Sequence, residues 1–210
     1  MKLSDKEHPK ILFEDNHLLV VDKEHGMLTQ PDDTGRTSLE ELCKRFIKLR
    51  DEKPGNVFLH VVHRIDKPVA GIVVFAKSKK ALSRLQRSQR DGLWKKEYQA
   101  VVEGDPGTGE YVDYIEKGDG KAFISKNGKE SRLSFVTTKG VTHIRLHTGR
   151  YHQIRVQFAS RKHPIIGDVK YGSVKKYQNG IALVHSSVTF PHPIGDKSCT
   201  FTSTIKLKEV

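Results

Sequence analysis

The chain has 210 residues, of which 36% are hydrophobic, and its 37 Lys and Arg against 25 Asp and Glu give a formal net charge of +12. This length fits one domain or at most two, and the charge favours a polyanionic partner, either nucleic acid or an anionic membrane surface. The apolar runs fall far short of the roughly 20 residues of a membrane span. The N-terminus lacks the apolar core of a signal peptide, so we expect a cytoplasmic protein.

Hydrophobic periodicity and capping residues predict two helices in the first half of the chain. Ser38 and Glu41 have the spacing of a capping box before an amphipathic run. Ser78 and Gly92 are residue types that begin and end a helix. Apolar segments rich in β-formers predict strands at residues 11–21, where a turn separates two of them, and at residues 57–65 and 72–77.

The second half consists mostly of predicted strands. Residues 149–163 fit both a helical and a strand period, and we favour the helix. Strands outnumber helices and short turns join many of them, which predicts an α+β fold with an antiparallel or mixed sheet. We expect a single domain over residues 1–210, with a core at about 11–206. The predicted strands lie at residues 94–104, 110–115, 131–138, 141–149, 181–190 and 199–207.

Several common catalytic patterns are absent from the sequence. It has no phosphate-binding loop, no dinucleotide-binding glycine pattern and no nucleophile elbow. His60 and His63 have H-x-x-H spacing, but no further ligands stand at a distance typical of a metal site. Cys43 and Cys199 lack C-x-x-C partners, which argues against a disulfide framework or a zinc cluster. We therefore expect no metal or other cofactor.

The stretch VVHRIDKPVAGIVVFAK, residues 61–77, carries more charge than a simple turn between strands needs. Asp66 follows an apolar segment, and strand alternation would place Arg64 on the same face. Considered locally, a turn in which Asp66 caps its own backbone and pairs with Arg64 is the favoured interpretation. The alternative is a carboxylate that faces a cleft.

Two later stretches combine aromatic or basic side chains with apolar strand or helix positions. Tyr98 is either an ordinary core tyrosine or a ring that stacks on a nucleobase. The segment LHTGRYHQIRVQFA concentrates donors suited to phosphates and base edges, although solvated helix charges are the simpler explanation. These donors are Arg150, His152, Gln153 and Arg155.

Taken together, these motifs resemble those of the RluA-type RNA pseudouridine synthases. HRIDKPVAGIVVFAKS is similar to the family signature around its catalytic aspartate, KKEYQAVVEG to the motif around its active-site tyrosine, and LHTGRYHQIRVQFA to its T-G-R-T-H-Q-I-R motif. ILFEDNHLLVVDKEHGMLTQP, HPIIGDVKYG and LVHSSVTFPHP are similar to further family elements. The resemblance covers residues 11–195, with the motifs in family order.

The resemblance implies a pseudouridine synthase fold, with a mixed sheet and a central catalytic cleft, and an isomerase (an intramolecular transferase) that converts uridine to pseudouridine within RNA. Asp66 falls on the catalytic aspartate, Tyr98 on the active-site tyrosine, and Arg155 on the arginine that pairs with the aspartate. Arg64 falls on the arginine that fills the gap left by the flipped base. We assign substrate binding to Arg64, His63, Arg150, His152 and Gln153.

The sequence departs from the family pattern at Pro68–Ala70, at Tyr151 and at Glu24–His25, which bears on substrate choice more than on chemistry. We expect a protein without the S4-type RNA-binding domain that many members of the family carry before this region. We expect ribosomal RNA or tRNA as the partner, no membrane, no obligate protein partner, and a monomer. Two alternatives remain: a non-catalytic RNA-binding or ribosome-assembly protein, and a nuclease, which the lack of clustered carboxylates disfavours.

Overall fold

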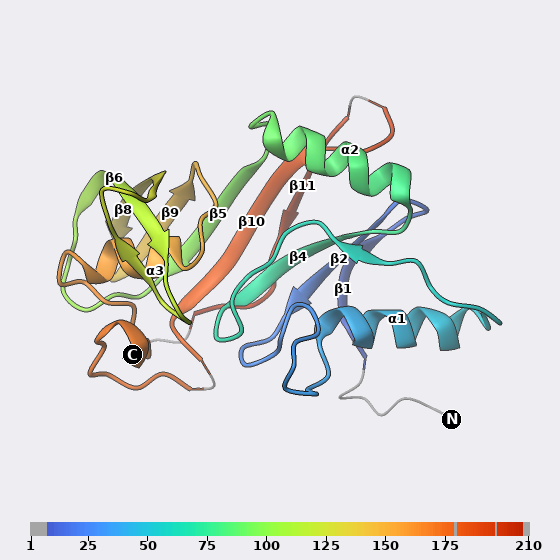
Figure 1. The fold of residues 1–210 in the computed structure, drawn as a ribbon, viewed down its shortest axis with the longest axis horizontal. Coiled ribbons are helices and arrows are strands. Elements are labelled where there is room, and N and C mark those ends of the chain that lie inside the picture. Colours follow the sequence, from blue (N-terminus) through green and yellow to red (C-terminus); the bar gives the residue numbers. More distant parts are fainter. Residues whose placement is uncertain (1–7, 179, 196, 208–210) are drawn as a thin grey trace. The chain divides into compact units, whose positions relative to one another are not determined.

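The structure is a computed structural model that describes residues 8–178, 180–195 and 197–207. Its internal contacts divide the chain into unit 1, Met1–Trp94 with Ser187–Ile205, and unit 2, Lys95–Ser186 with Lys206–Val210. Helices and antiparallel strand pairs make up the molecule, which confirms the predicted α+β class with a mixed, largely antiparallel sheet (Figure 1). A single domain over residues 1–210 stays a prediction.

The sheet of unit 1 is built around two strands that are buried along their whole length. β2 pairs antiparallel with β4 in a register that places Val20 opposite Val74. The strand order is β1-β2-β4-β10, with β3 paired to β4 and β11 paired to β10. The strands are β1 (Lys10–Glu14), β2 (Leu18–Lys23), β3 (His60–Val61), β4 (Ala70–Ala76), β10 (Leu183–Pro191), of which unit 1 holds the part from Ser187, and β11 (Ser198–Thr202).

Both helices predicted in the first half are present. α1 (Leu39–Arg50) begins with a complete capping box, in which the Ser38 hydroxyl accepts from the Glu41 N–H and the Glu41 carboxylate accepts from the Ser38 N–H. α2 (Lys79–Arg90) begins at Ser78, and Gly92 follows it at a φ of +73°, a left-handed conformation that glycine adopts without strain. No helix within the described residues is long and apolar enough to cross a membrane.

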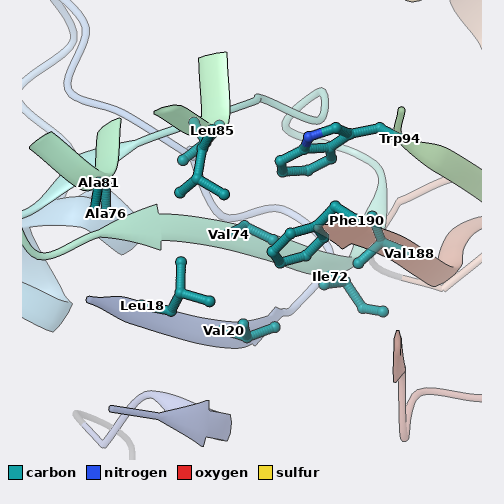
Figure 2. Packing of buried hydrophobic residues seen from close by; sticks show 11 residues of the cluster. Leu18, Val20, Ile72, Val74, Ala76, Ala81, Leu85, Trp94, Val188 and Phe190 are labelled. Carbon is teal, nitrogen blue, oxygen red and sulfur yellow. The ribbon is translucent and has the colours of Figure 1, made fainter. Parts of the chain in front are cut away.

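The hydrophobic core of unit 1 lies between α2 and the strands (Figure 2). Ala81 and Leu85 of α2 pack in one cluster with Leu18 and Val20 of β2. At the end of this cluster the Trp94 ring stacks on Phe190 of β10, at 4.3 Å between ring centroids and 13° between planes. Residues from the two ends of the chain therefore complete a single core.

The strand predicted at residues 57–65 is mostly wrong, because β3 covers only His60–Val61. Beyond Val61, the side chain of His63 accepts a hydrogen bond that a backbone carbonyl would accept in a continued strand. The Val62 N–H still donates to the Val74 carbonyl, but the Val74 N–H donates to Nε2 of His63 at 3.3 Å instead of to a carbonyl of a continued strand. The chain leaves the sheet at this point.

Unit 2 contains an antiparallel sheet and one short helix. Its strand order from β5 onward is β5-β9-β8-β6-β7. The helix favoured for residues 149–163 is confirmed as α3 (Gln153–Ala159); residues 153–158 are all buried, which explains why both periods fitted. The three-residue strand β7 was not predicted, and the strand predicted at 199–207 ends at Thr202. The elements are β5 (Lys95–Ala100), β6 (Thr108–Lys117), β7 (Ala122–Ile124), β8 (Lys129–Thr138), β9 (Val141–Leu146) and a 3-10 turn, η2 (Val169–Tyr171).

We predict that Leu85→Ala destabilises the protein by about 2–5 kcal/mol, because the side chain is fully buried in the α2 cluster and its removal leaves a cavity. Urea denaturation measures the change. Leu93→Ala is the matched control, since Leu93 is 54% exposed, and we expect a change within about 0.5 kcal/mol. Equal losses in the two variants would contradict this description of the core.

Candidate active site

Asp66 lies in the loop between β3 and β4 of unit 1, where its side chain is half-buried. The Asp66 carbonyl accepts from the Val69 N–H at 3.0 Å, which closes a turn. Arg64 is exposed. The expectation that strand alternation aligns Arg64 with Asp66 is wrong, because no strand runs through residues 62–69.

The side chain of Lys23 is completely buried at the end of β2 and holds the Asp66 loop. Its ammonium donates to three backbone carbonyls: that of Met27 at 2.8 Å, that of Glu24 at 3.1 Å and that of Lys67 at 3.2 Å. The last of these lies next to Asp66 in the chain. One buried cation thus joins the segment after β2 to the segment that carries the carboxylate.

Further contacts from the segment after β2 fix the backbone on both sides of Asp66. The Thr29 hydroxyl donates to the Ile65 carbonyl at 2.8 Å, and the Gly26 N–H donates to the Lys67 carbonyl at 2.9 Å. The His25 ring contacts the Pro68 carbonyl through Nδ1 at 2.9 Å. The Asp66 loop is therefore anchored on both sides of Asp66.

Burial lowers the pKa of Lys23 from 10.5 to about 7, because the charged form loses its hydration. The negative charges of Asp66 and Glu24 act in the opposite direction and favour the ammonium form. Lys23 and Asp66 thus interact electrostatically inside unit 1.

His63 is buried and contributes to the packing of unit 1. Besides accepting from the Val74 N–H, its ring meets the Trp94 ring edge to face, with centroids 5.7 Å apart. The family departures at Val69 and Ala70 are also buried, at 2% and 0% exposure. These buried side chains therefore pack inside unit 1, whereas Arg64 is exposed to solvent.

Tyr98 lies on β5 in unit 2, with 7% of its surface exposed. Its ring stacks on His185 of β10, with centroids 4.6 Å apart and planes 21° from parallel. Lys96 lies on the same face of β5, because side chains alternate along a strand, and burial lowers its pKa to about 8. The structure thus fixes the plane of the Tyr98 ring beside a desolvated lysine.

Arg155 of α3 forms a buried bidentate ion pair with Asp168. Its Nε donates to Asp168 Oδ2 at 2.7 Å and its Nη2 donates to Oδ1 at 2.9 Å, and both side chains are at most 5% exposed. The guanidinium also lies 5.0 Å from the centroid of the Tyr171 ring. The sequence did not reveal these partners, although both belong to the HPIIGDVKYG element.

The other predicted substrate-binding residues of unit 2 differ in solvent exposure. Arg150 is exposed, and its Nε donates to the Glu130 carbonyl at 3.1 Å. Gln153 is buried, and its amide oxygen accepts from the Thr148 hydroxyl and the Arg150 N–H. His152 is buried in a left-handed conformation with a φ of +52° just before α3. The last two shape the turn before α3, and Arg150 faces solvent.

Unit 1 therefore carries Asp66, Arg64 and His63, and unit 2 carries Tyr98, Arg155, Arg150, His152 and Gln153. Pairing of Arg155 with Asp66 and a central cleft stay predictions. Within the described part of the chain, no group of three or more His, Cys, Asp or Glu side chains could hold a metal ion. Unit 1 offers a carboxylate on an anchored loop and an exposed arginine, and unit 2 offers a buried guanidinium, a stacked aromatic ring and an exposed arginine.

Comparison with known proteins finds matches along most of the chain. The family model described as RNA pseudouridylate synthase matches residues 17–160. The "Uncharacterized RNA pseudouridine synthase YhcT" of Bacillus subtilis is 33% identical over 89% of this chain, which spans only 65% of that protein. The "Dual-specificity RNA pseudouridine synthase RluA" of Haemophilus influenzae is 32% identical over 92% of this chain and 91% of its own length.

A solved structure supports the fold assignment. "Human RNA Pseudouridylate Synthase Domain Containing 1" superposes with a TM-score of 0.76, covering all of this chain and 94% of that one, at 19% sequence identity. At that identity the likeness concerns the fold. The family model covers more than half of the chain, and relatives of more than 30% identity align along most of it. The chain belongs to the RNA pseudouridylate synthase family.

Proposed function

We propose that this protein is an RNA pseudouridine synthase that isomerises specific uridines in ribosomal RNA or tRNA, with Asp66 as the catalytic carboxylate. The observation that carries the proposal is the anchoring of Asp66, whose loop is fixed by Lys23 and by backbone contacts on both sides. Membership of the family supports the reaction. Two relatives are named ribosomal large subunit pseudouridine synthases and another a dual-specificity enzyme, which supports these RNA classes.

The reaction breaks the bond between C1′ of the ribose and N1 of the base, rotates the base and joins C1′ to C5. The proton on C5 is lost and N1 gains one, so no net oxidation or reduction occurs and no cofactor is expected. The carboxylate of Asp66 either attacks as a nucleophile or begins proton abstraction from the sugar. A base inside an RNA helix must first leave its stack, at a cost of a few kcal/mol.

Residues of unit 2 have complementary roles in this proposal. Tyr98 stacks on the extruded uracil, and its contact with His185 keeps the ring in one orientation. Arg155 supplies a permanent positive charge for the reacting carboxylate, and its bidentate bond to Asp168 sets the direction of the guanidinium. Arg64 and Arg150, which are exposed, contact the RNA.

Lys23 is a positioning residue in this proposal. Its buried amino group holds the Asp66 loop through the Lys67 carbonyl. A monomer acting in the cytoplasm without an obligate protein partner remains part of the prediction.

Asp66→Asn should abolish the release of tritium from RNA labelled at C5 of uridine, because the amide is neither a nucleophile nor a base. Affinity for the same RNA should be retained, since the amide has nearly the size and shape of the carboxylate and removes a negative charge that would repel phosphates. Asp33→Asn, which changes an exposed carboxylate of the same unit, is the control and should keep full turnover. Substantial turnover by Asp66→Asn would exclude the proposed chemistry.

Asp168→Asn should lower the free energy of unfolding by about 3–5 kcal/mol, because it removes the carboxylate that balances a buried guanidinium. Urea titration measures the effect. Glu110→Gln removes a carboxylate from an ion pair with Arg132 that is about half exposed, and should cost less than about 1 kcal/mol. If both variants lost the same stability, the buried Arg155–Asp168 pair would not stabilise the fold more than an exposed ion pair does.

The stability of the protein should rise between pH 7 and pH 10 because of Lys23. Its folded pKa of about 7 lies below its unfolded value of 10.5, so in this window the unfolded chain binds the additional proton. The free energy of unfolding then increases by up to about 1.4 kcal/mol per pH unit. Denaturation of Lys23→Met over the same range should lack this increment, and parallel curves for the two proteins would refute it.

A further inference from the structure

Two segments of unit 2 that are distant in the chain bring three exposed lysines together. Lys117 and Lys121 flank the turn of the β6–β7 hairpin, and Lys170 belongs to η2. The Lys170 ammonium donates to the Gly120 carbonyl in the hairpin turn at 2.8 Å, so the hairpin and η2 are in contact. These three residues are called the hairpin lysines.

Aromatic rings hold two of the hairpin lysines in place. The ammonium of Lys117 lies 5.2 Å from the centroid of the Tyr151 ring, and that of Lys121 lies 5.0 Å from the centroid of the Tyr171 ring. His152 connects the two tyrosines, because it stacks on Tyr151 at 3.9 Å and its Nδ1 lies 2.9 Å from the Tyr171 hydroxyl. A cation over an aromatic face is attracted to it but keeps its net charge.

No carboxylate within the described residues pairs with any of the hairpin lysines. On α1, by comparison, Lys44 pairs with Glu40 and Arg50 pairs with Glu14. The hairpin turn itself contains one acidic residue, Asp119, which makes no ion pair with them. Three positive charges on the hairpin and the contacting η2, none of them paired with a carboxylate, attract an anion with several charges.

The hairpin lysines are connected to the candidate catalytic residues of the same unit. Tyr171, over which Lys121 lies, also lies 5.0 Å from the Arg155 guanidinium. Tyr151 and His152 directly precede α3, the helix that carries Arg155. An anion bound by the hairpin lysines is therefore held beside the residues that set the orientation of Arg155.

We propose that the hairpin lysines bind backbone phosphates of the RNA strand that carries the target uridine. The identity of the anion rests on the proposed function. A strand of RNA presents phosphates at regular intervals, which suits several separate ammonium groups, and such contacts position the RNA without reading its sequence. Tyr151, over which Lys117 lies, is itself 37% exposed.

The test compares two triple variants of the full chain that lose the same charge. K117Q/K121Q/K170Q removes the hairpin lysines, and K10Q/K48Q/K53Q removes exposed lysines of unit 1. Affinity for fluorescein-labelled single-stranded oligouridylate is measured by anisotropy at several salt concentrations. Each phosphate contact in a single strand contributes about 0.7 to the slope of log affinity against log salt, so the first variant should lose about 2 from its slope.

The control variant should keep the slope of the unmodified protein, and K117R/K121R/K170R should restore it, because arginine keeps the charge. An unchanged slope in K117Q/K121Q/K170Q, or an equal loss in the control, would overturn the inference. Circular dichroism verifies that each variant is folded. Tritium release is recorded separately with the unmodified protein: its absence would refute the proposed function and leave the salt-slope result to decide the binding surface.

Discussion

The buried ammonium group of Lys23 connects the sheet of unit 1 to the loop that carries Asp66. A lysine without hydration is stable only where other atoms accept its hydrogen bonds, and three backbone carbonyls do so here. Those carbonyls belong to two segments, so the hydrogen bonds that stabilise the cation also fix the distance between the segments. The placement of a carboxylate in a loop thereby depends on the interior of the sheet.

Unit 2 also holds a buried cationic side chain, but a carboxylate takes the place of the backbone carbonyls. Arg155 is almost completely buried, and Asp168 satisfies it through two parallel hydrogen bonds. The planar geometry of that pair leaves the guanidinium little rotational freedom, and the Tyr171 ring covers one side of it. In both units the hydrogen-bond partners of a buried basic side chain specify its direction. A shorter neutral side chain would pack more easily but would leave the loop or the helix free to shift.

Much of the fold could be predicted because its signals are local. The capping box at Ser38 and the glycine at position 92 lie next to the helices that they bound, and the buried strands β2 and β4 are continuous apolar runs. The prediction was wrong over residues 57–65, since the end of β3 is decided by a side chain, that of His63, which bonds to Val74 on another strand. No periodicity within the segment reveals that bond.

The residues of the candidate site also fall into those that the sequence could identify and those that it could not. Asp66, Tyr98 and Arg155 could be identified because each stands in a motif of contiguous residues. Lys23, Asp168 and His185 could not, because their roles come from contacts with residues many positions away, as in the pair of Arg155 with Asp168. The sequence also did not show which side chains are buried. Gln153 and Arg150 stand in the same motif, yet the Gln153 amide is enclosed by its own turn and the Arg150 guanidinium faces solvent.

The discontinuity of unit 1 has a consequence for the order in which the chain acquires structure during its synthesis. Val188 and Phe190 belong to the same core cluster as Leu18 and Val20, so that core is incomplete until the ribosome has made β10. β5 to β9 with α3 are translated earlier and contact one another. Part of the apolar surface of the N-terminal strands therefore stays uncovered until β10 is translated near the end of synthesis.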